Sequence, residues 1–244
     1  MTRRASARID VVVPARDEED HVSACLVALG VAVAHLRDRR PDVAVGVTLV
    51  LDDCADRTGA LAAAAAARDP ALTVLEARLG AVGPARLLGV RAALDVAGPP
   101  VRNRWIANTD ADSRVDPRWL LQQLDALERD AAVLVGAVVP DPEDLAPEVL
   151  ARWLLTHPPG ATLGHVHGAN LGIRADVHER LGGFEPIAEH EDVRLVAAAR
   201  AAGFRVEATE EFPVVTSGRF AGRTPGGYAE HLRAVYGDAA IEAS

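Results

Sequence analysis

Short runs of consecutive apolar residues alternate, along the first half of the chain, with longer segments whose apolar positions recur at helical spacing. The runs predict buried strands at residues 9–13, 43–51, 72–76, 105–107 and 132–139. The segments between them predict helices at about residues 22–36, 60–68, 85–96 and 117–129. This alternation of strands and helices is typical of a mostly parallel, doubly wound α/β sheet with right-handed crossovers.

The pattern is less regular in the second half. Helices are predicted at residues 146–155, 175–181, 189–202 and 227–236, and short strands at 204–208 and 212–216. The glycine-containing stretch 163–174 is interpreted as a further strand, on which His165 and His167 would share one face. The last residues, 238–244, are expected to fray. Together these elements fit a single domain over residues 1–244.

Composition limits the classes of protein that fit. The chain has 244 residues, of which 49% are hydrophobic and 25% charged, so it can bury one sizeable core. Its formal net charge of −9 argues against nucleic acid as a partner. Cys25 and Cys54 are too few for a disulfide framework or a zinc site. No signal peptide precedes Asp10 and no stretch reaches the roughly 18 apolar residues of a membrane helix, so we expect a cytoplasmic protein without an integral membrane segment. The oligomeric state leaves no signal in the sequence.

The strand at 105–107 runs directly into Asp110 and Asp112. On extended backbone these carboxylates project to the same side, at the strand end where ligands bind in open α/β sheets. Carboxylate oxygens suit Mg²⁺ or Mn²⁺, which leave their other positions to water and substrate phosphates. An acidic turn before the next helix could have the same sequence, so the aspartate pair alone does not distinguish a metal site from such a turn.

Charged residues also follow the first two strands. Arg16 and Glu18 come after the first strand, Asp52 and Asp53 end the second, and Arg86 lies near the start of the third helix. The acidic residues could simply compensate helix dipoles, whereas a cation such as Arg86 near a helix amino terminus suggests an external anion. Neither a Gly-x-Gly-x-x-Gly fingerprint nor a P-loop follows the first strand, which weakens a dinucleotide or NTPase interpretation.

The second half carries its own candidates. Glu191 and Asp192 open a predicted helix, either as ordinary helix charges or with a general base among them. His167 could contact an acceptor or a metal, although an ordinary polar strand residue is the more common case. Arg219 and Arg223 lie in a glycine-containing basic loop that could close over a bound diphosphate.

Four separated regions, taken in order, resemble the inverting, nucleotide-sugar-dependent glycosyltransferases of family 2, which have the GT-A fold. They are VVVPARDEE at 11–19, VLDDCADRT at 50–58, DAD at 110–112, and the group GANL, GGF and EDV at 168–171, 182–184 and 191–193. Each motif is short, but four in the family's order are specific. The resemblance covers roughly residues 8 to 216.

The resemblance implies a nucleotide-sugar-binding half at about residues 8–112 and an acceptor-binding half at about 113–237. It implies that Asp192 is the catalytic base. The implied metal ligands are Asp110 and Asp112, with His190 or His231 as candidates for a third. The implied donor-side residues are Pro14, Arg16, Glu18, Asp52, Asp53, Arg86, Asp110, Arg219 and Arg223, with Asp52 on the nucleotide base. The implied acceptor-side residues are His167, Gly168, Asn170 and Glu191.

The expected activity is therefore transfer of a sugar from a nucleoside diphosphate sugar to a hydroxyl group, with Mn²⁺ or Mg²⁺ as cofactor. The acceptor would be a small molecule or a lipid-linked glycan met from solution. Cys54 and Ala55 stand where the family more often has glycine and serine. The alternatives are a sugar-phosphate nucleotidyltransferase, which would need a phosphate loop, and a catalytically silent nucleotide-sugar-binding protein of the same fold. In a retaining enzyme, Asp192 would lose its role as base.

Overall fold

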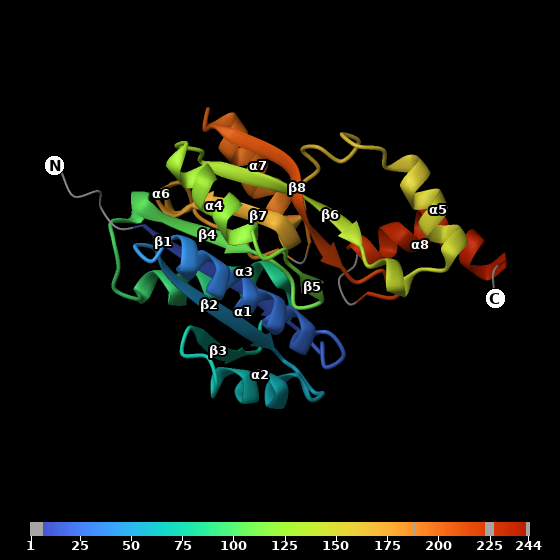
Figure 1. Ribbon diagram of the computed structural model, residues 1–244, viewed down its shortest axis with the longest axis horizontal. Coiled ribbons are helices and arrows are strands. Elements are labelled where there is room, and N and C mark those ends of the chain that lie inside the picture. Colours follow the sequence, from blue (N-terminus) through green and yellow to red (C-terminus); the bar gives the residue numbers. More distant parts are fainter. Residues whose placement is uncertain (1–6, 188, 223–226, 243–244) are drawn as a thin grey trace.

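The computed structural model describes residues 7–187, 189–222 and 227–242, and these residues form one α/β unit around an eight-stranded sheet (Figure 1). The strands are β1 (Arg8–Ala15), β2 (Ala44–Asp52), β3 (Leu72–Ala77), β4 (Arg104–Asn108), β5 (Ser113–Arg114), β6 (Val133–Pro140), β7 (Leu171–Arg174) and β8 (Val206–Thr216). The helices are α1 (Val22–Arg39), α2 (Thr58–Ala66), α3 (Val82–Asp95), α4 (Trp119–Glu128), α5 (Pro147–Thr156), α6 (Ala175–Arg180), α7 (Glu191–Ala201) and α8 (Tyr228–Glu242). Their spatial order in the sheet is β3-β2-β1-β4-β7-β6-β8-β5.

The predicted doubly wound core is confirmed for the first four long strands, which run parallel. Alternate residues of β1 point to opposite faces: Val11 and Val13 pack in one buried cluster with α1, α2 and α4, whereas Val12 packs in the other with α3, α6 and α7. Both faces of the sheet are thus covered (Figure 1). Burial on both faces explains why these strands appear in the sequence as continuous apolar runs.

The sheet becomes mixed beyond β4, where β7 runs antiparallel to both β4 and β6. The prediction of one strand over 163–174 was too long: residues 159–164 form turns and only Leu171–Arg174 is strand. Gly160 and Gly164 have positive φ angles of 89° and 87°, which extended backbone does not allow. His165 and His167 therefore do not share a strand face.

Two further predictions differ at the carboxyl end. The strands expected at 204–208 and 212–216 form one strand, β8, whose pairing with β6 shifts register between Gly136 and Val138. Phe212 has a φ angle of 50°, so the polar residues between the two predicted strands form an irregularity within one strand. Helix α8 continues to Glu242, past its expected end at Tyr236.

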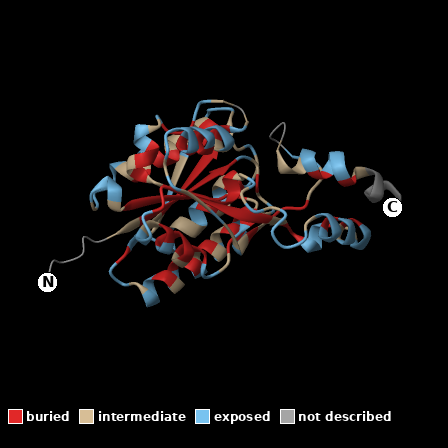
Figure 2. Ribbon diagram, turned by 90° about the horizontal axis from the view of Figure 1, so that it is seen from above, coloured by how far each residue is buried: buried red, intermediate tan, exposed pale blue. Residues whose placement is uncertain are grey.

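Helices α5 and α8 contact each other and lie beyond one end of the sheet in both views (Figures 1 and 2). Their packing makes a third, smaller buried cluster of Leu145, Val149, Trp153, Leu232 and Tyr236. We call this helix pair the α5–α8 arm. Among the described residues, no helix has an apolar stretch long enough to cross a bilayer.

Gly172 is essential where β7 crosses the centre of the sheet, because a hydrogen bond from the indole of Trp105 to Gln123 (2.6 Å) lies directly over it. A Cβ atom at position 172 would overlap both side chains. We expect Gly172→Ala to lower the free energy of unfolding by about 1–3 kcal/mol through overpacking. The matched control is Gly30→Ala, on α1, where no atom lies within 4 Å of the added methyl group and a gain of about 0.5–1 kcal/mol is expected. Equal effects of the two variants in urea unfolding would contradict this packing argument.

Candidate active site

The carboxyl ends of β1, β2 and β4 meet at one edge of the sheet, because the three strands are parallel and in register there. Each strand is followed by a polar segment, so charged side chains from distant parts of the sequence converge. Two pockets open at this edge. The first has a volume of about 180 Å³ and is lined by most of the residues that the sequence predicted on the donor side. It is lined by Pro14, Ala15, Arg16, Glu18, Asp52, Gly80, Ala81, Val82, Ala85, Asp110, Ala111, Asp112 and Arg219.

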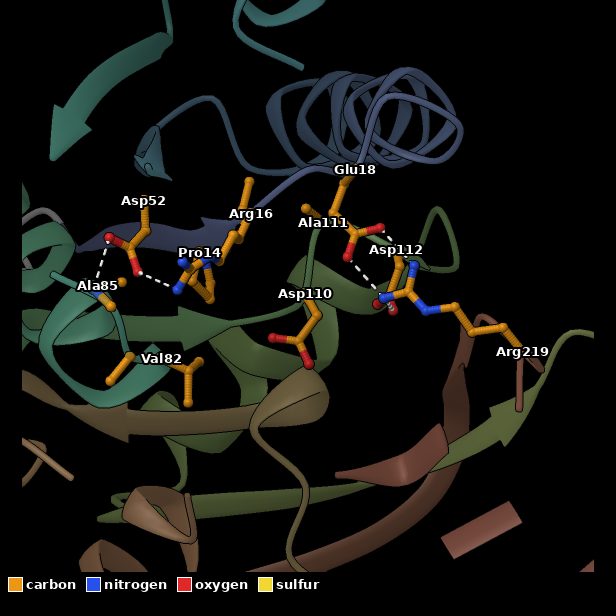
Figure 3. Close-up of a pocket in the computed structure, with 13 residues that line it drawn as sticks. Pro14, Arg16, Glu18, Asp52, Val82, Ala85, Asp110, Ala111, Asp112 and Arg219 are labelled. Carbon is orange, nitrogen blue, oxygen red and sulfur yellow. Dashed lines mark hydrogen bonds and ion pairs between the residues drawn. The ribbon is translucent and has the colours of Figure 1, made fainter. Parts of the chain in front are cut away.

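Asp52 stands at one end of this first pocket and the carboxylates of Asp110 and Asp112 at the other (Figure 3). One carboxylate oxygen of Asp52 accepts hydrogen bonds from the backbone N–H groups of Leu79 (2.5 Å) and Gly80 (3.1 Å). Its other oxygen, Oδ2, lies 4.0 Å from a guanidinium nitrogen of Arg16. The backbone contacts fix the orientation of Asp52, which leaves the second oxygen as the one that a ligand can reach.

Asp112 is held from three sides. Its Oδ1 accepts hydrogen bonds from the hydroxyls of Ser113 (3.2 Å) and Thr216 (3.3 Å), and its Oδ2 accepts one from Arg219 (2.9 Å). Arg219 comes from the segment after β8 and also makes a two-pronged contact with Glu18, with both bonds at 2.7 Å (Figure 3). The guanidinium therefore connects the segment after β1 with the segment after β4.

The charges around Asp112 are not balanced. Burial, with repulsion from Asp110 and Glu18, raises the pKa of Asp112 to about 6 although Arg219 opposes the shift. Burial is the largest cause of this shift, and the neighbouring carboxylates of Asp110 and Glu18 add to it. Oxygen donors with excess negative charge fit a hard divalent cation such as Mn²⁺ or Mg²⁺. Asp110 and Asp112 are the residues that could hold it, and Glu18 is joined to Asp112 through Arg219.

Arg86 joins the two halves of the sheet edge. Its guanidinium donates hydrogen bonds to Asp110 (2.6 Å), to Glu191 at the start of α7 (3.0 Å) and to the backbone carbonyl of Gly168 (3.0 Å). Burial opposes the charge on Arg86, but the carboxylates of Asp110, Glu191 and Asp192 outweigh it and raise its pKa. Burial raises the pKa of Glu191, against the effect of Arg86. A side chain at Gly168 would overlap the guanidinium, which explains the glycine.

The second pocket is larger, about 800 Å³, and lies on the other side of the aspartate pair. It shares Val82, Asp110, Asp112 and Arg219 with the first pocket. Asp192, in the first turn of α7, lines it, and its carboxylate accepts a hydrogen bond from the N–H of Val193 (2.7 Å). The two pockets thus meet at the aspartate pair, with Asp192 on the side of the larger one.

Several predicted residues occupy the second pocket. His167, Gly168, Glu191, His190 and His231 all line it. Burial lowers the pKa of His167, despite the nearby Asp192. Among the described residues, neither His190 nor His231 lies close enough to Asp110 and Asp112 to complete a three-ligand group.

Two predicted residues lie outside both pockets, and a third is not among the described residues. Asp53, with a side chain 53% exposed, lines neither pocket and lies 3.9 Å from Arg16. Asn170 is buried and lines neither pocket: its side chain accepts a hydrogen bond from Trp119 (2.8 Å) and donates one to the carbonyl of Ala137 (2.9 Å). Its place is in the packing between α4 and β6. Arg223 lies outside the described residues.

Some residues near the site were not found from the sequence. Asp17, Cys54 and Asp56 bring possible ligand atoms within 4.8 Å of one another. Backbone N–H groups already occupy the two carboxylates: those of Ala55 and Asp56 donate to Asp17, and those of Glu19 and Thr58 to Asp56. The group therefore ties together the segments after β1 and β2. In the sequence, only the aspartate at position 17 hints at this group, because aspartate tolerates the positive φ angle of 51° found there.

The chain can be compared with known proteins. The model of the family described as "Glycosyl transferase family 2" matches residues 10–211. No curated protein sequence matches the chain.

Solved structures share the fold. A mannosyltransferase from Pyrobaculum calidifontis in complex with GDP-Man and Mn²⁺ is similar with a TM-score of 0.63 and 19% identity, over 91% of this chain and 59% of that chain. Glucosyl-3-phosphoglycerate synthase from Mycobacterium tuberculosis, in complex with Mn²⁺, UDP and phosphoglyceric acid, gives a TM-score of 0.58 at 15% identity, over 93% of this chain and 76% of that chain. GalNAc-T7 with UDP, GalNAc and Mn²⁺ gives a TM-score of 0.63 at 13% identity, over 96% of this chain and 48% of that chain. The chain thus spans about three fifths of the mannosyltransferase, and the predicted GT-A fold is confirmed.

The imbalance of charge at Asp112 predicts that this residue destabilises the metal-free protein at neutral pH. Its pKa is about 6 in the folded protein against about 3.9 in an unfolded chain, so folding takes up a proton between these values. Stability is therefore lost as the pH rises from about 4 to 6, by at most about 3 kcal/mol. With EDTA present, we expect Asp112→Asn to melt above the wild type at pH 7.5, and the difference to shrink toward pH 4.

Asp116→Asn is the matched control for this measurement. The hydrogen bond from Arg118 lowers the pKa of Asp116, so this carboxylate contributes stability that is present above about pH 4 and lost as the pH falls. The control variant should therefore melt at or below the wild type at pH 7.5. A lower melting temperature for Asp112→Asn than for the wild type at that pH would contradict the interpretation of the site.

Proposed function

This chain belongs to glycosyl transferase family 2, and we propose that it transfers a sugar from a nucleoside diphosphate sugar to a hydroxyl group of an acceptor, with inversion at the anomeric carbon. The observation that carries the proposal is the meeting of two pockets at Asp110 and Asp112. A donor in the first pocket and an acceptor in the second would bring their reacting atoms together at this junction.

The first pocket is the proposed donor site. The accessible oxygen of Asp52 would accept a hydrogen bond from the nucleotide base, and the diphosphate would lie at the opposite end, near Asp110 and Asp112. The mannosyltransferase was solved with GDP-Man and Mn²⁺, and the glucosyl-3-phosphoglycerate synthase with UDP and Mn²⁺. These complexes support a nucleoside diphosphate sugar as the donor.

Asp112 and Asp110, with Glu18 beside them, are the proposed ligands of Mn²⁺ or Mg²⁺. When bound, such a cation would neutralise the negative charge that develops on the departing diphosphate. Arg219 would contact that diphosphate, and the same role is proposed for Arg223, which lies outside the described residues. Arg86 was expected to contact the donor directly, but its hydrogen bonds go to Asp110, Glu191 and Gly168. We therefore assign Arg86 the role of holding Asp110 in position.

Asp192 is the proposed catalytic base. It would remove the proton of the acceptor hydroxyl as the oxygen attacks the anomeric carbon, while the bond from that carbon to the diphosphate breaks on the opposite face. Such a single displacement inverts the configuration. The neighbouring Glu191 is buried against Arg86, which fixes the start of α7 and leaves Asp192 directed at the acceptor pocket.

The donor site is tested by melting the protein with UDP, GDP, ADP, CDP or dTDP, each with and without Mn²⁺. A diphosphate at 100 times its Kd should add about 2.7 kcal/mol of stability, or about 5–10 °C for a chain of this size. We expect one diphosphate to give this shift, only with Mn²⁺, and the shift to disappear in Asp112→Asn and Asp52→Ala. Asp53→Ala, altered next to Asp52 but outside both pockets, should keep it. The same shift in the absence of metal, or its survival in Asp112→Asn, would refute the proposed donor site.

The base is tested separately. Asp192→Asn should lower the rate of sugar transfer about 10²- to 10⁴-fold, because the amide cannot accept the proton. Its thermal shift with diphosphate and Mn²⁺ should be unchanged. Glu189→Gln, which alters another carboxylate of the same pocket, should retain the wild-type rate. Full activity in Asp192→Asn would rule out this residue as the base.

A further inference from the structure

The acceptor side of the second pocket is built by the α5–α8 arm, which the mechanism above does not use. Five aromatic side chains of the arm line the pocket, and one of them, Tyr236, is hydrogen-bonded to Thr156 at the end of α5. We call the other four the aromatic wall: Trp153 and His157 from α5 and its end, and Tyr228 and His231 from α8.

The rings of the aromatic wall are paired. Those of Trp153 and His157 are stacked, with centroids 4.3 Å apart and planes 6° from parallel. The rings of Tyr228 and His231 are stacked more loosely, at 6.3 Å and 26°. His167 meets Tyr228 edge-on, at 6.1 Å and 86°. Each half of the wall thus carries an imidazole on a larger aromatic ring.

Hydrogen bonds hold this arrangement in place. The Nδ1 of His157 donates a hydrogen bond of 2.9 Å to the backbone carbonyl of Trp153, which leaves Nε2 for a ligand. The hydroxyl of Thr156 lies 2.6 Å from that of Tyr236, which ties the end of α5 to α8. A wall fixed in this way costs little ordering entropy when a ligand binds.

The charges of the pocket favour an uncharged ligand. The described residues that line it include five carboxylates, of Asp110, Asp112, Glu189, Glu191 and Asp192. They include two guanidinium groups, and both are paired with carboxylates: Arg86 with Asp110 and Glu191, and Arg219 with Glu18 and Asp112. Among the described residues, an anionic acceptor would thus face five carboxylates while both guanidinium groups are already paired, which favours an uncharged ligand.

We propose that the acceptor is an uncharged saccharide whose ring packs its C–H face against the aromatic wall, with its hydroxyl groups toward the imidazoles and carboxylates of the pocket; this inference rests on the proposed function. Flat aromatic surfaces with a few fixed polar groups suit a ligand that is apolar on one face and polar at its rim. The volume of about 800 Å³ lies in the range that holds drug-sized ligands, enough for more than one sugar ring. The acceptor would thus differ in charge from phosphoglyceric acid, which is bound in the synthase from Mycobacterium tuberculosis.

The test measures binding without turnover. The protein is saturated with Mn²⁺ and the diphosphate found by thermal shift, and binding of maltose, cellobiose, lactose and 3-phosphoglycerate is followed by saturation-transfer difference NMR. We expect at least one disaccharide to bind and 3-phosphoglycerate to bind at least tenfold more weakly. His157→Ala and His231→Ala should each weaken disaccharide binding by roughly two- to tenfold, the contribution of one ring contact. Leu155→Ala is the control, because Leu155 lies on α5, is 82% exposed and lines neither pocket.

Each outcome decides. Tighter binding of 3-phosphoglycerate than of every disaccharide, no disaccharide binding at all, or disaccharide binding that survives both histidine substitutions would overturn the inference. An unchanged diphosphate shift in the variants shows that they remain folded. Absence of any diphosphate shift in the wild type would instead contradict the proposed function, so the two failures are distinguishable.

Discussion

The pairing of two guanidinium groups with the carboxylates at the end of β4 is the interaction on which the site depends. Arg86, with a side chain 3% exposed, reaches Asp110, and Arg219 reaches Asp112. A buried charge left without its partner costs about 3–5 kcal/mol, so the buried Arg86 cannot lose its carboxylates without disturbing the elements around it. Because Arg86 also contacts α7 and Gly168, and Arg219 also contacts Glu18, this pairing fixes the relative positions of segments far apart in the sequence.

The same interaction separates the roles of neighbouring residues. Glu191 is neutralised by Arg86 and buried, whereas Asp192, one position later, faces the larger pocket. Burial, with repulsion from Asp110 and Glu18, raises the pKa of Asp112, which costs stability at neutral pH and is common among functional residues. Strained backbone gathers in the same region: Asp17, Asp53 and His190 have positive φ angles and lie in the segments around the site.

The sequence was sufficient for the elements whose patterns are local. Continuous apolar runs located β1, β2, β4 and β6, and the aspartates after β4 marked the sheet edge. The partners of Arg86 could not be predicted, because they come from segments about 24 to 105 residues away. Asn170, whose side chain is polar, was expected on the acceptor side. That side chain is instead buried and bonded to the indole of Trp119, a partner that lies 51 residues away in the sequence. The stretch 163–174 carried small and apolar residues that suit a strand, but Gly164 lies in a turn with a positive φ angle and only Leu171–Arg174 is strand.

The second pocket is built partly by residues that lie beyond the match to the family model. The match to the family model ends at residue 211, before Arg219 and before the whole of α8. The sheet and the aspartate pair are thus what the chain shares with its family, whereas the segment beyond the match supplies one arginine of the site and half of the aromatic wall. Helix α5 lies inside the match, and α8 packs against it. The aromatic wall thus needs both helices. Acceptor specificity is therefore expected to depend in part on residues that lie beyond the match to the family model.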